Sequence, residues 1–234
     1  MEDKLYRIFK YAGDFSLYGL LFYIPISNAL IEICFGIMFL SFVGKKLIHS
    51  DFRFLKFWPN LFLLVFFIFC GLSVINSGQF FHKSLVSWIA KWGQYIMACI
   101  IVQDIASEKK VLRRTVMVFL FSATLVVLSG LSQGFIGFEF LRNRTLFLMA
   151  NGTRAITSSF SHYNGLGAYL VVTVPLILAL FISRKEIYKI KSILLLIFAI
   201  LSIFTLFLTF SRGSWISFFS ALVLMYILSG GNKK

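Results

Sequence analysis

The chain has 234 residues, of which 59% are hydrophobic, including 18% aromatic, and only 14% are charged. A soluble domain carries about 25% charged residues, so this composition excludes a water-soluble globular protein. The 23 Lys and Arg residues against 9 Asp and Glu residues give a net charge of +14. In a soluble chain such an excess would suggest nucleic-acid binding. In a membrane protein it is instead explained by the side of the bilayer on which each cation lies, so we expect no nucleic-acid partner.

Apolar stretches follow one another along the chain, and each is about long enough to cross ~30 Å of hydrocarbon as a helix. The pattern predicts an all-α fold, a polytopic bundle of about seven to eight transmembrane helices in a single integral membrane domain over residues 1–234. Six spans are predicted directly: 59–75, 84–104, 115–131, 166–182, 192–210 and 214–229.

The segment 15–43 is either one long tilted helix or two shorter helices. Pro25 and Asn28 together interrupt its apolar run, which favours the broken version. The cations Lys4, Arg7 and Lys10 before it imitate a signal peptide, but apolar sequence resumes at once through Val43. The sequence therefore favours an uncleaved membrane segment.

Loop charge predicts the orientation. Placing 44–58, 105–114, 183–191 and 230–234 in the cytoplasm collects fourteen Lys and Arg residues there, against five on the other face. The five are Lys83, Arg142, Arg144, Arg154 and Arg212. By the positive-inside rule the C-terminus is cytoplasmic, and the long loop 132–165 lies on the outer face.

Arg212 lies in a link of about three residues between two predicted spans, so the chain must form a tight helical hairpin there. We expect Gly213 to supply the backbone conformation that the turn needs and Ser214 to cap the following helix. Trp215 suits a membrane interface. A helix N-terminus with an adjacent arginine favours an anion, and a phosphate or pyrophosphate is the expected ligand.

Further outer cations could join this site. They are Arg154, Arg142 and Arg144 in the outer loop, and Lys91 within the predicted span 84–104. Each has an alternative role as an interfacial anchor that extends its charge to the lipid headgroups. His162 is the candidate general base, and an ordinary polar loop role is the alternative. The sequence contains no metal-binding motif, and we expect no metal and no cofactor.

Two motifs carry a family resemblance. The stretch Arg154 to Gly165, running into Leu166–Leu170 and Pro175, resembles the segment before a central helix in O-antigen ligases and polymerases. The hairpin Ser211-Arg212-Gly213-Ser214-Trp215, about fifty residues later, resembles the other landmark of that superfamily. Ser211, Gly213, Trp215 and Asn164 are the structural residues of these motifs.

The resemblance implies a glycosyl-transfer enzyme of lipopolysaccharide or polysaccharide biosynthesis, in the bacterial inner membrane, with its site on the periplasmic face. The donor would be an undecaprenyl-pyrophosphate-linked glycan, and the acceptor lipid A core or a growing polysaccharide. Arg212 and Arg154 would neutralise the leaving pyrophosphate.

Members of the superfamily usually continue into a large periplasmic loop with a catalytic histidine. We therefore expect this chain to be an N-terminal half of such a protein. A non-catalytic transporter or flippase component that binds an anionic lipid-linked sugar is the alternative function, and an inactive remnant is a third.

Overall fold

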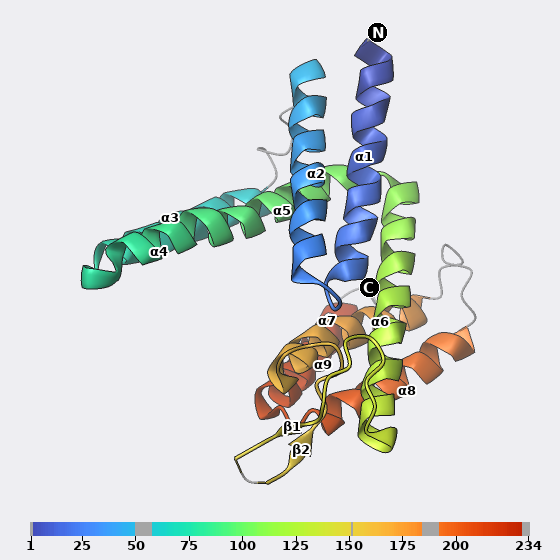
Figure 1. The fold of residues 1–234 in the computed structure, drawn as a ribbon. Coiled ribbons are helices and arrows are strands. Elements are labelled where there is room, and N and C mark those ends of the chain that lie inside the picture. The colour runs from blue at the N-terminus through green and yellow to red at the C-terminus, as the bar shows by residue number, and fades with distance from the viewer. Residues whose placement is uncertain (1, 50–57, 151, 184–191, 231–234) are drawn as a thin grey trace. The chain divides into compact units, whose positions relative to one another are not determined.

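The computed structural model describes residues 2–49, 58–150, 152–183 and 192–230. In these ranges the chain is almost entirely helical, as the sequence predicts (Figure 1). The elements are α1 (Glu2–Tyr23), α2 (Asn28–Ile48), α3 (Trp58–Ile75), η2 (Gly78–Phe80), α4 (Phe81–Ser87), η3 (Trp88–Trp92), α5 (Gly93–Ile105), α6 (Lys109–Ile136), β1 (Phe147–Leu148), β2 (Arg154–Ala155), α7 (Tyr163–Ser183), α8 (Ser192–Leu208) and α9 (Arg212–Gly230).

The predicted break in 15–43 is confirmed, because α1 ends at Tyr23 and α2 begins at Asn28. Helix α6 is longer than the predicted span 115–131, and it starts among the charged residues at Lys109. Hydropathy marks the part of a helix that suits the membrane, whereas the helix itself ends where its hydrogen bonds end. The loop that the charge bias predicts to be outer is accordingly shorter than predicted, from residue 137 to residue 162, and we keep the name outer loop for it.

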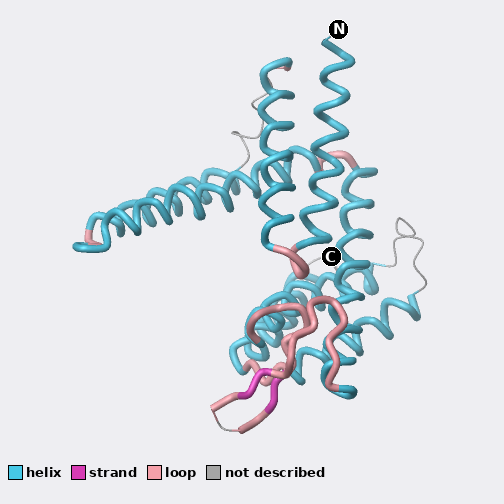
Figure 2. The backbone as a smooth tube through the Cα atoms, viewed as in Figure 1, coloured by secondary structure: helices cyan, strands magenta, loops and turns pink. Residues whose placement is uncertain are grey.

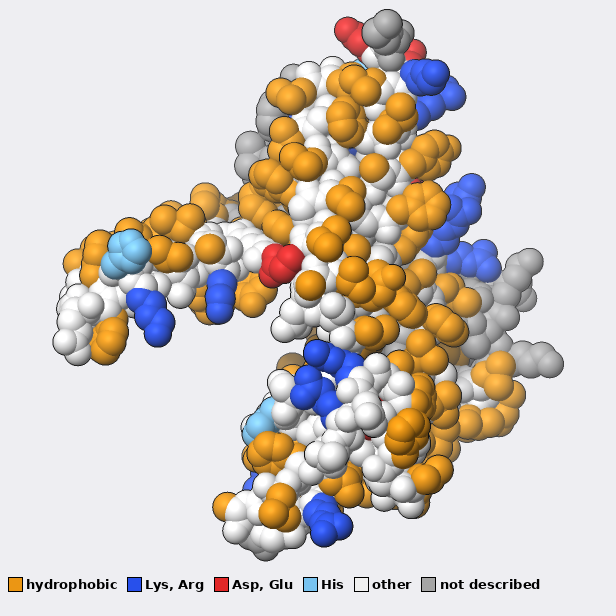
Figure 3. All heavy atoms as spheres, in the orientation of Figure 1, with side chains coloured by type: hydrophobic (Ala, Val, Ile, Leu, Met, Phe, Trp, Pro, Cys, Tyr) orange, Lys and Arg blue, Asp and Glu red, His pale blue; other side chains and the backbone are white. Residues whose placement is uncertain are grey.

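Four helical segments are long and apolar enough to cross a membrane: Trp58–Ile75, Gly78–Ile105, Lys109–Ile136 and Tyr163–Ile182. Two shorter apolar helices, Ser192–Leu208 and Arg212–Leu228, follow them. Hydrophobic side chains are widespread on the visible surface of the helices (Figure 3). These features indicate a membrane protein. Because only four helices of the described ranges qualify, the predicted number of seven to eight spans is not confirmed.

The chain divides into two compact units: Met1–Leu21 with Asn28–Thr115, and Phe22–Ser27 with Val116–Lys234. The core of the first unit joins α1, α2, α5 and the start of α6 through Leu17, Met38, Phe42, Ile101, Ile105 and Val111. Gly44 lets the Phe9 ring approach, since a Cβ there would lie 2.7 Å from that ring. In the same unit Trp88 of η3 stacks on Phe67 of α3, with ring centroids 4.6 Å apart.

The second unit packs α6, α7, α8 and α9 around a core of apolar residues. These are Ala123, Val126, Val127, Ile156, Leu166, Tyr169, Leu170, Val174, Leu206 and Phe218. Buried threonines in this core bond to carbonyls of their own helices, as Thr173 does to Tyr169 and Thr205 to Leu201, both at 2.8 Å. Such bonds satisfy hydroxyl groups without interrupting the apolar packing. Pro175 lies inside α7.

Several predictions concern residues outside the described ranges. They are the predicted cytoplasmic cations Arg53, Lys56, Arg184, Lys185, Lys189, Lys191, Lys233 and Lys234. The predicted orientation of the chain depends on them and stays a prediction.

Candidate functional site

The link between α8 and α9 consists of Thr209, Phe210 and Ser211, the three-residue length that the sequence predicts. The turn is made at Phe210, which has a φ of 52°, and not at Gly213, which lies in the first turn of α9. The expected role of Gly213 is therefore wrong. Hydrogen bonds from the amides of Thr209 and Phe210 to the last turn of α8 fix the reversal three residues earlier than expected.

The residue before α9 is Ser211, so the expected capping role of Ser214 is also wrong. The Ser211 hydroxyl donates to Oδ1 of Asn164, 2.8 Å away. Its Oγ also lies 2.8 Å from Oγ of Ser214. Because a serine hydroxyl has one proton, Ser214 donates in this second bond. A chain of hydrogen bonds therefore runs from α9 through Ser211 to the N-terminal turn of α7.

Gly167 allows the two helices to approach this closely. A Cβ at this position would lie 2.3 Å from Oγ and 2.9 Å from Cβ of Ser214. No side chain fits in that space, so a larger residue would push the N-terminal halves of α7 and α9 apart. The sequence places Gly167 within the first motif, but nothing in the sequence reveals its contact with the second.

An open groove of about 430 Å³ lies between these two helices. It is lined by Asn164, Ala168, Val171, Ser211, Gly213, Ser214 and Ser217. Side-chain hydroxyl and amide groups of both motifs line it, together with Ala168 and Val171 from α7. We refer to this feature as the motif groove.

Arg212 is the first residue of α9 and lies in sequence between two residues that line the motif groove. Its side chain is exposed and makes no hydrogen bond or ion pair with another described residue. The first amides of a helix have no partner within the helix, and the helix dipole places partial positive charge there. Arg212 therefore places a cation at the N-terminus of α9, next in sequence to two residues that line the groove.

Arg154 is exposed in β2, which pairs antiparallel with β1 so that Leu148 faces Arg154 (Figure 2). Two residues later the Ile156 amide donates to the carbonyl of Leu208 at 3.4 Å. Leu208 is the last residue of α8 and lies four positions before Arg212. Both predicted arginines are thus attached to the same end of α8.

Gln133 of α6 holds the loop that carries Arg154, and sequence reasoning missed it. Its side-chain oxygen accepts from the amides of Thr157 and Ser158, both at 2.8 Å, and its nitrogen donates to the carbonyls of Arg144 and Thr145, both at 3.1 Å. Ser158 has a φ of 47°, so these bonds support a backbone conformation that serine rarely adopts. The sequence signal that could have revealed this role is a glutamine within an otherwise apolar helix, because a polar side chain there needs hydrogen-bond partners.

Glu139, which follows α6, is 1% exposed and organises the same loop. Its carboxylate accepts hydrogen bonds from the Ser129 hydroxyl and from the amides of Leu141, Arg142 and Arg144. Burial by itself raises the pKa of Glu139, but these hydrogen bonds outweigh it and hold the pKa below the ordinary value. The residue is therefore a structural anion.

The other candidates divide between structural and exposed positions. The Arg144 side chain is half-buried and donates from Nε to the carbonyl of Ser159 at 3.0 Å, which gives it a role within the loop. Arg142 is exposed. Lys91 is exposed in η3 and belongs to the first compact unit. A pyrophosphate-binding role for these residues stays a prediction.

His162 immediately precedes α7, and its Nδ1 accepts from the amide of Asn164 at 3.2 Å. Its ring also contacts Phe147 and Tyr163, with centroids 4.7 and 4.1 Å away. The hydrogen bond occupies the Nδ1 lone pair and places the ring proton on Nε2 in the neutral form. In this geometry His162 caps α7, and its proposed role as a base stays a prediction.

Trp215 joins the two arms of the α8–α9 hairpin. Its Nε1 donates to the carbonyl of Leu206 at 3.3 Å, and its ring lies 5.5 Å from that of Phe207.

Within the described residues, no group of three or more His, Cys, Asp and Glu side chains is arranged to hold a metal ion. Comparison of the chain with protein-family models, with curated proteins and with solved structures finds no match.

Proposed function

We propose that the chain is a membrane protein of the O-antigen ligase and polymerase type, acting on an undecaprenyl-pyrophosphate-linked glycan at the motif groove. The observation that supports this most is the hydrogen bond between Asn164 and Ser211. It joins the two separate motifs on which the resemblance rests, and it does so beside an exposed arginine at a helix N-terminus.

In the proposed reaction the bond between the anomeric carbon of the glycan and the donor pyrophosphate oxygen breaks. The electron pair leaves with the pyrophosphate, and a hydroxyl oxygen of lipid A core or of a growing polysaccharide forms the new bond to that carbon. The proton that this hydroxyl loses is released to solvent. Arg212 and Arg154 neutralise the charge that develops on the leaving group. An arginine suits this task because its planar guanidinium can bind two phosphate oxygens at once.

The proposal places the groove at the periplasmic face of a bacterial inner membrane, with the C-terminus in the cytoplasm. This orientation follows from the excess of loop cations on the opposite face. It would bring the groove within reach of a lipid-linked donor in the outer leaflet. The proposal assigns charge neutralisation to the arginines and does not assign a general base.

Binding of undecaprenyl pyrophosphate to the purified protein in nanodiscs tests the site. Arg212→Gln should weaken binding about tenfold, the loss of roughly one charged contact or about 1.4 kcal/mol. Undecaprenyl monophosphate should bind less tightly than the pyrophosphate. Lys83→Gln, which removes another exposed cation, is the matched control and should leave binding unchanged.

Equal losses from Arg212→Gln and Lys83→Gln would show that binding follows total charge and would contradict the assigned site. Glycan transfer is measured separately, with donor and acceptor supplied. Tight binding that depends on Arg212, together with no transfer, would favour the alternative function of a transporter or flippase component.

A further inference from the structure

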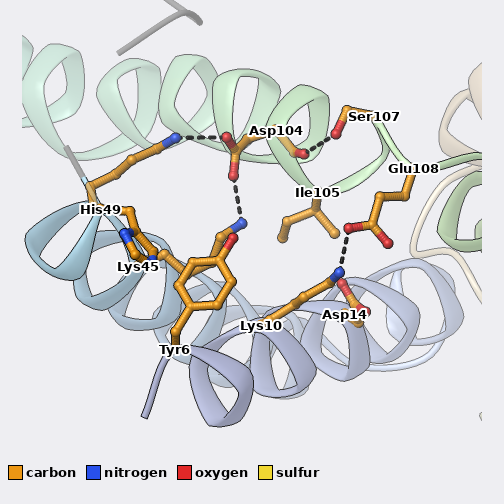
Figure 4. A pocket seen from close by; sticks show the side chains of 10 residues that line it. Tyr6, Lys10, Asp14, Lys45, His49, Asp104, Ile105, Ser107 and Glu108 are labelled. Carbon is orange, nitrogen blue, oxygen red and sulfur yellow. Dashed lines mark hydrogen bonds and ion pairs between the residues drawn. The ribbon is translucent and has the colours of Figure 1, made fainter. Parts of the chain in front are cut away.

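The motif groove differs in its chemistry from a cavity of about 380 Å³ in the first compact unit (Figure 4). Charged side chains line that cavity and pair with one another. Lys45 and Lys46 both donate to the carboxylate of Asp104, and a second ion pair joins Lys10 to Glu108. None of the described residues that line the motif groove is charged. A charged group inside the groove would therefore find no ion-pair partner in its lining.

The polar groups of the groove have fixed directions of hydrogen bonding. Because the Ser211 hydroxyl donates to Oδ1 of Asn164, the amide nitrogen of Asn164 keeps two N–H donors without a partner among the described residues. Ser214 uses its own proton in the bond to Ser211, so its oxygen remains an acceptor. Ser217 is exposed and makes no hydrogen bond with another described residue, so its hydroxyl can donate and accept.

The α7 side of the groove is apolar beyond Asn164. Asn164, Ala168 and Val171 follow one another at spacings of four and three residues, so they share one face of α7. The groove thus combines methyl groups on α7 with hydroxyl groups on α9. A hydrocarbon chain in this place would leave the amide and hydroxyl groups without hydrogen-bond partners, which is unfavourable. A sugar ring matches the lining better, because it has C–H groups on its face and hydroxyl groups at its edge.

We infer that the motif groove binds an uncharged sugar ring, the one that is bonded to the donor pyrophosphate. Asn164 donates from its amide nitrogen to a hydroxyl oxygen of the sugar, and Ser214 and Ser217 accept from sugar hydroxyl groups. Ala168 and Val171 contact the C–H face of the ring. The groove volume of about 430 Å³ lies within the range of small-molecule pockets, about 300–1,000 Å³.

This inference rests on the proposed function, which assigns the donor pyrophosphate to Arg212. Ser211 and Gly213, the sequence neighbours of Arg212, both line the groove. A sugar bonded to a pyrophosphate at Arg212 therefore has the groove next to it. The charged part of the donor and its first sugar are then bound by different residues, so their contributions to binding can be measured separately.

Binding to the purified full chain in nanodiscs tests the inference with two ligands, undecaprenyl pyrophosphate and the same lipid carrying one hexose. In the parent protein the hexose should tighten binding about tenfold, the effect of one or two additional hydrogen bonds. Ser217→Ala should reduce this gain to about threefold or less. Ala168→Leu, whose larger side chain occupies the groove, should abolish the gain.

Ser220→Ala is the matched control, because Ser220 is an exposed serine of the same helix that does not line the groove. It should keep the full gain from the hexose. The gain compares two ligands on the same variant, so a change in the fraction of folded protein does not alter it.

The outcomes separate the sugar site from the proposed function. Equal binding of the two lipids by the parent protein, while Arg212→Gln weakens both, overturns the sugar site and leaves the proposed function standing. An undiminished gain in both Ser217→Ala and Ala168→Leu also overturns the sugar site. A gain that Ser217→Ala reduces, together with no effect of Arg212→Gln on either lipid, supports the sugar site and contradicts the assigned pyrophosphate site. Absence of binding of both lipids overturns both.

Discussion

The hydroxyl of Ser211 donates a hydrogen bond to the side-chain oxygen of Asn164 across 47 positions of sequence, at 2.8 Å. Ser211 is 4% exposed, so this bond forms in a largely desolvated place. The bond fixes the N-terminal turn of α7 relative to the start of α9. Both residues line the motif groove, which makes the pair the natural first target for mutagenesis.

Ser211→Ala and Asn164→Ala should each lower the free energy of unfolding by about 1 kcal/mol, because each leaves a polar partner without its hydrogen bond. The double variant should lose less than the sum, with a coupling energy of roughly 0.5–1.5 kcal/mol. Chemical unfolding in mixed micelles measures this. Asn164→Ala combined with Ser217→Ala is the control and should be additive, since Ser217 lines the groove without bonding Asn164.

Gly167→Ala should destabilise the protein by about 1–3 kcal/mol, because the new methyl group would overlap Ser214. Gly213→Ala is the matched glycine control: a Cβ there meets nothing within 4 Å, and the residue is helical. Ser214→Gly should partly rescue Gly167→Ala. Thermal unfolding in detergent compares the parent, Gly167→Ala, Gly213→Ala and the double variant Gly167→Ala/Ser214→Gly. Gly167→Ala should be the least stable of the four. Equal losses of stability at the two glycines would contradict the close approach of α7 and α9.

Phe210→Gly should leave the protein as stable as the parent or more stable, because glycine adopts the φ of 52° without a steric penalty. Phe210→Val should be destabilised by about 1–2 kcal/mol, since a β-branched residue tolerates this conformation poorly. Ile200→Gly is the control that tests whether replacing any exposed apolar residue by glycine leaves the stability unchanged. Ile200 is exposed inside α8, so its replacement by glycine should cost about 1 kcal/mol.

Glu139 should make the outer loop sensitive to acid. Its pKa is lower in the folded protein than in the unfolded chain, where the ordinary value is 4.5. Its stabilising effect is therefore complete above that value and is lost as the pH falls through the lowered folded value. Glu139→Gln should cost about 1–3 kcal/mol at neutral pH, because its amide nitrogen would face backbone donors.

The pH dependence separates this effect from a general loss of stability. The Glu139→Gln variant should lose the part of the acid sensitivity that thermal melts of the parent show as the pH falls below 4.5. Glu2→Gln, at an exposed position in the first turn of α1, should keep the parental profile. A parental acid profile in Glu139→Gln would show that another group controls acid unfolding.

The sequence predicted those features that depend on hydropathy and on interruptions of it. The break between α1 and α2 and the three-residue length of the link between α8 and α9 follow from where apolar residues stop, although the link lies two residues earlier than predicted. The details of the turn could not be predicted in this way. The position of the left-handed residue depends on which amides find carbonyls at the end of α8, and this moved the turn from Gly213 to Phe210.

Charge counts predict an orientation of the chain, but they do not predict contacts. Lys45 and Lys46 were predicted only as cations that orient the chain, whereas the structure pairs both with Asp104. The same holds for Glu139, whose sequence position shows an isolated acid and whose partners are mostly backbone amides of its own loop. Contacts of this kind are set by tertiary packing, which a single sequence does not display.

Gln133 has a consequence for how the outer loop can change during evolution. Its amide group needs both a donor and an acceptor, because it binds carbonyls at residues 144–145 and amides at residues 157–158. Glutamate and lysine each lack one of these functions. The two anchored segments therefore tolerate no insertion or deletion. The turn between β1 and β2 carries none of these Gln133 bonds, so we expect changes of length to be tolerated better in that turn than at residues 144–145 or 157–158, with Arg154 kept in β2.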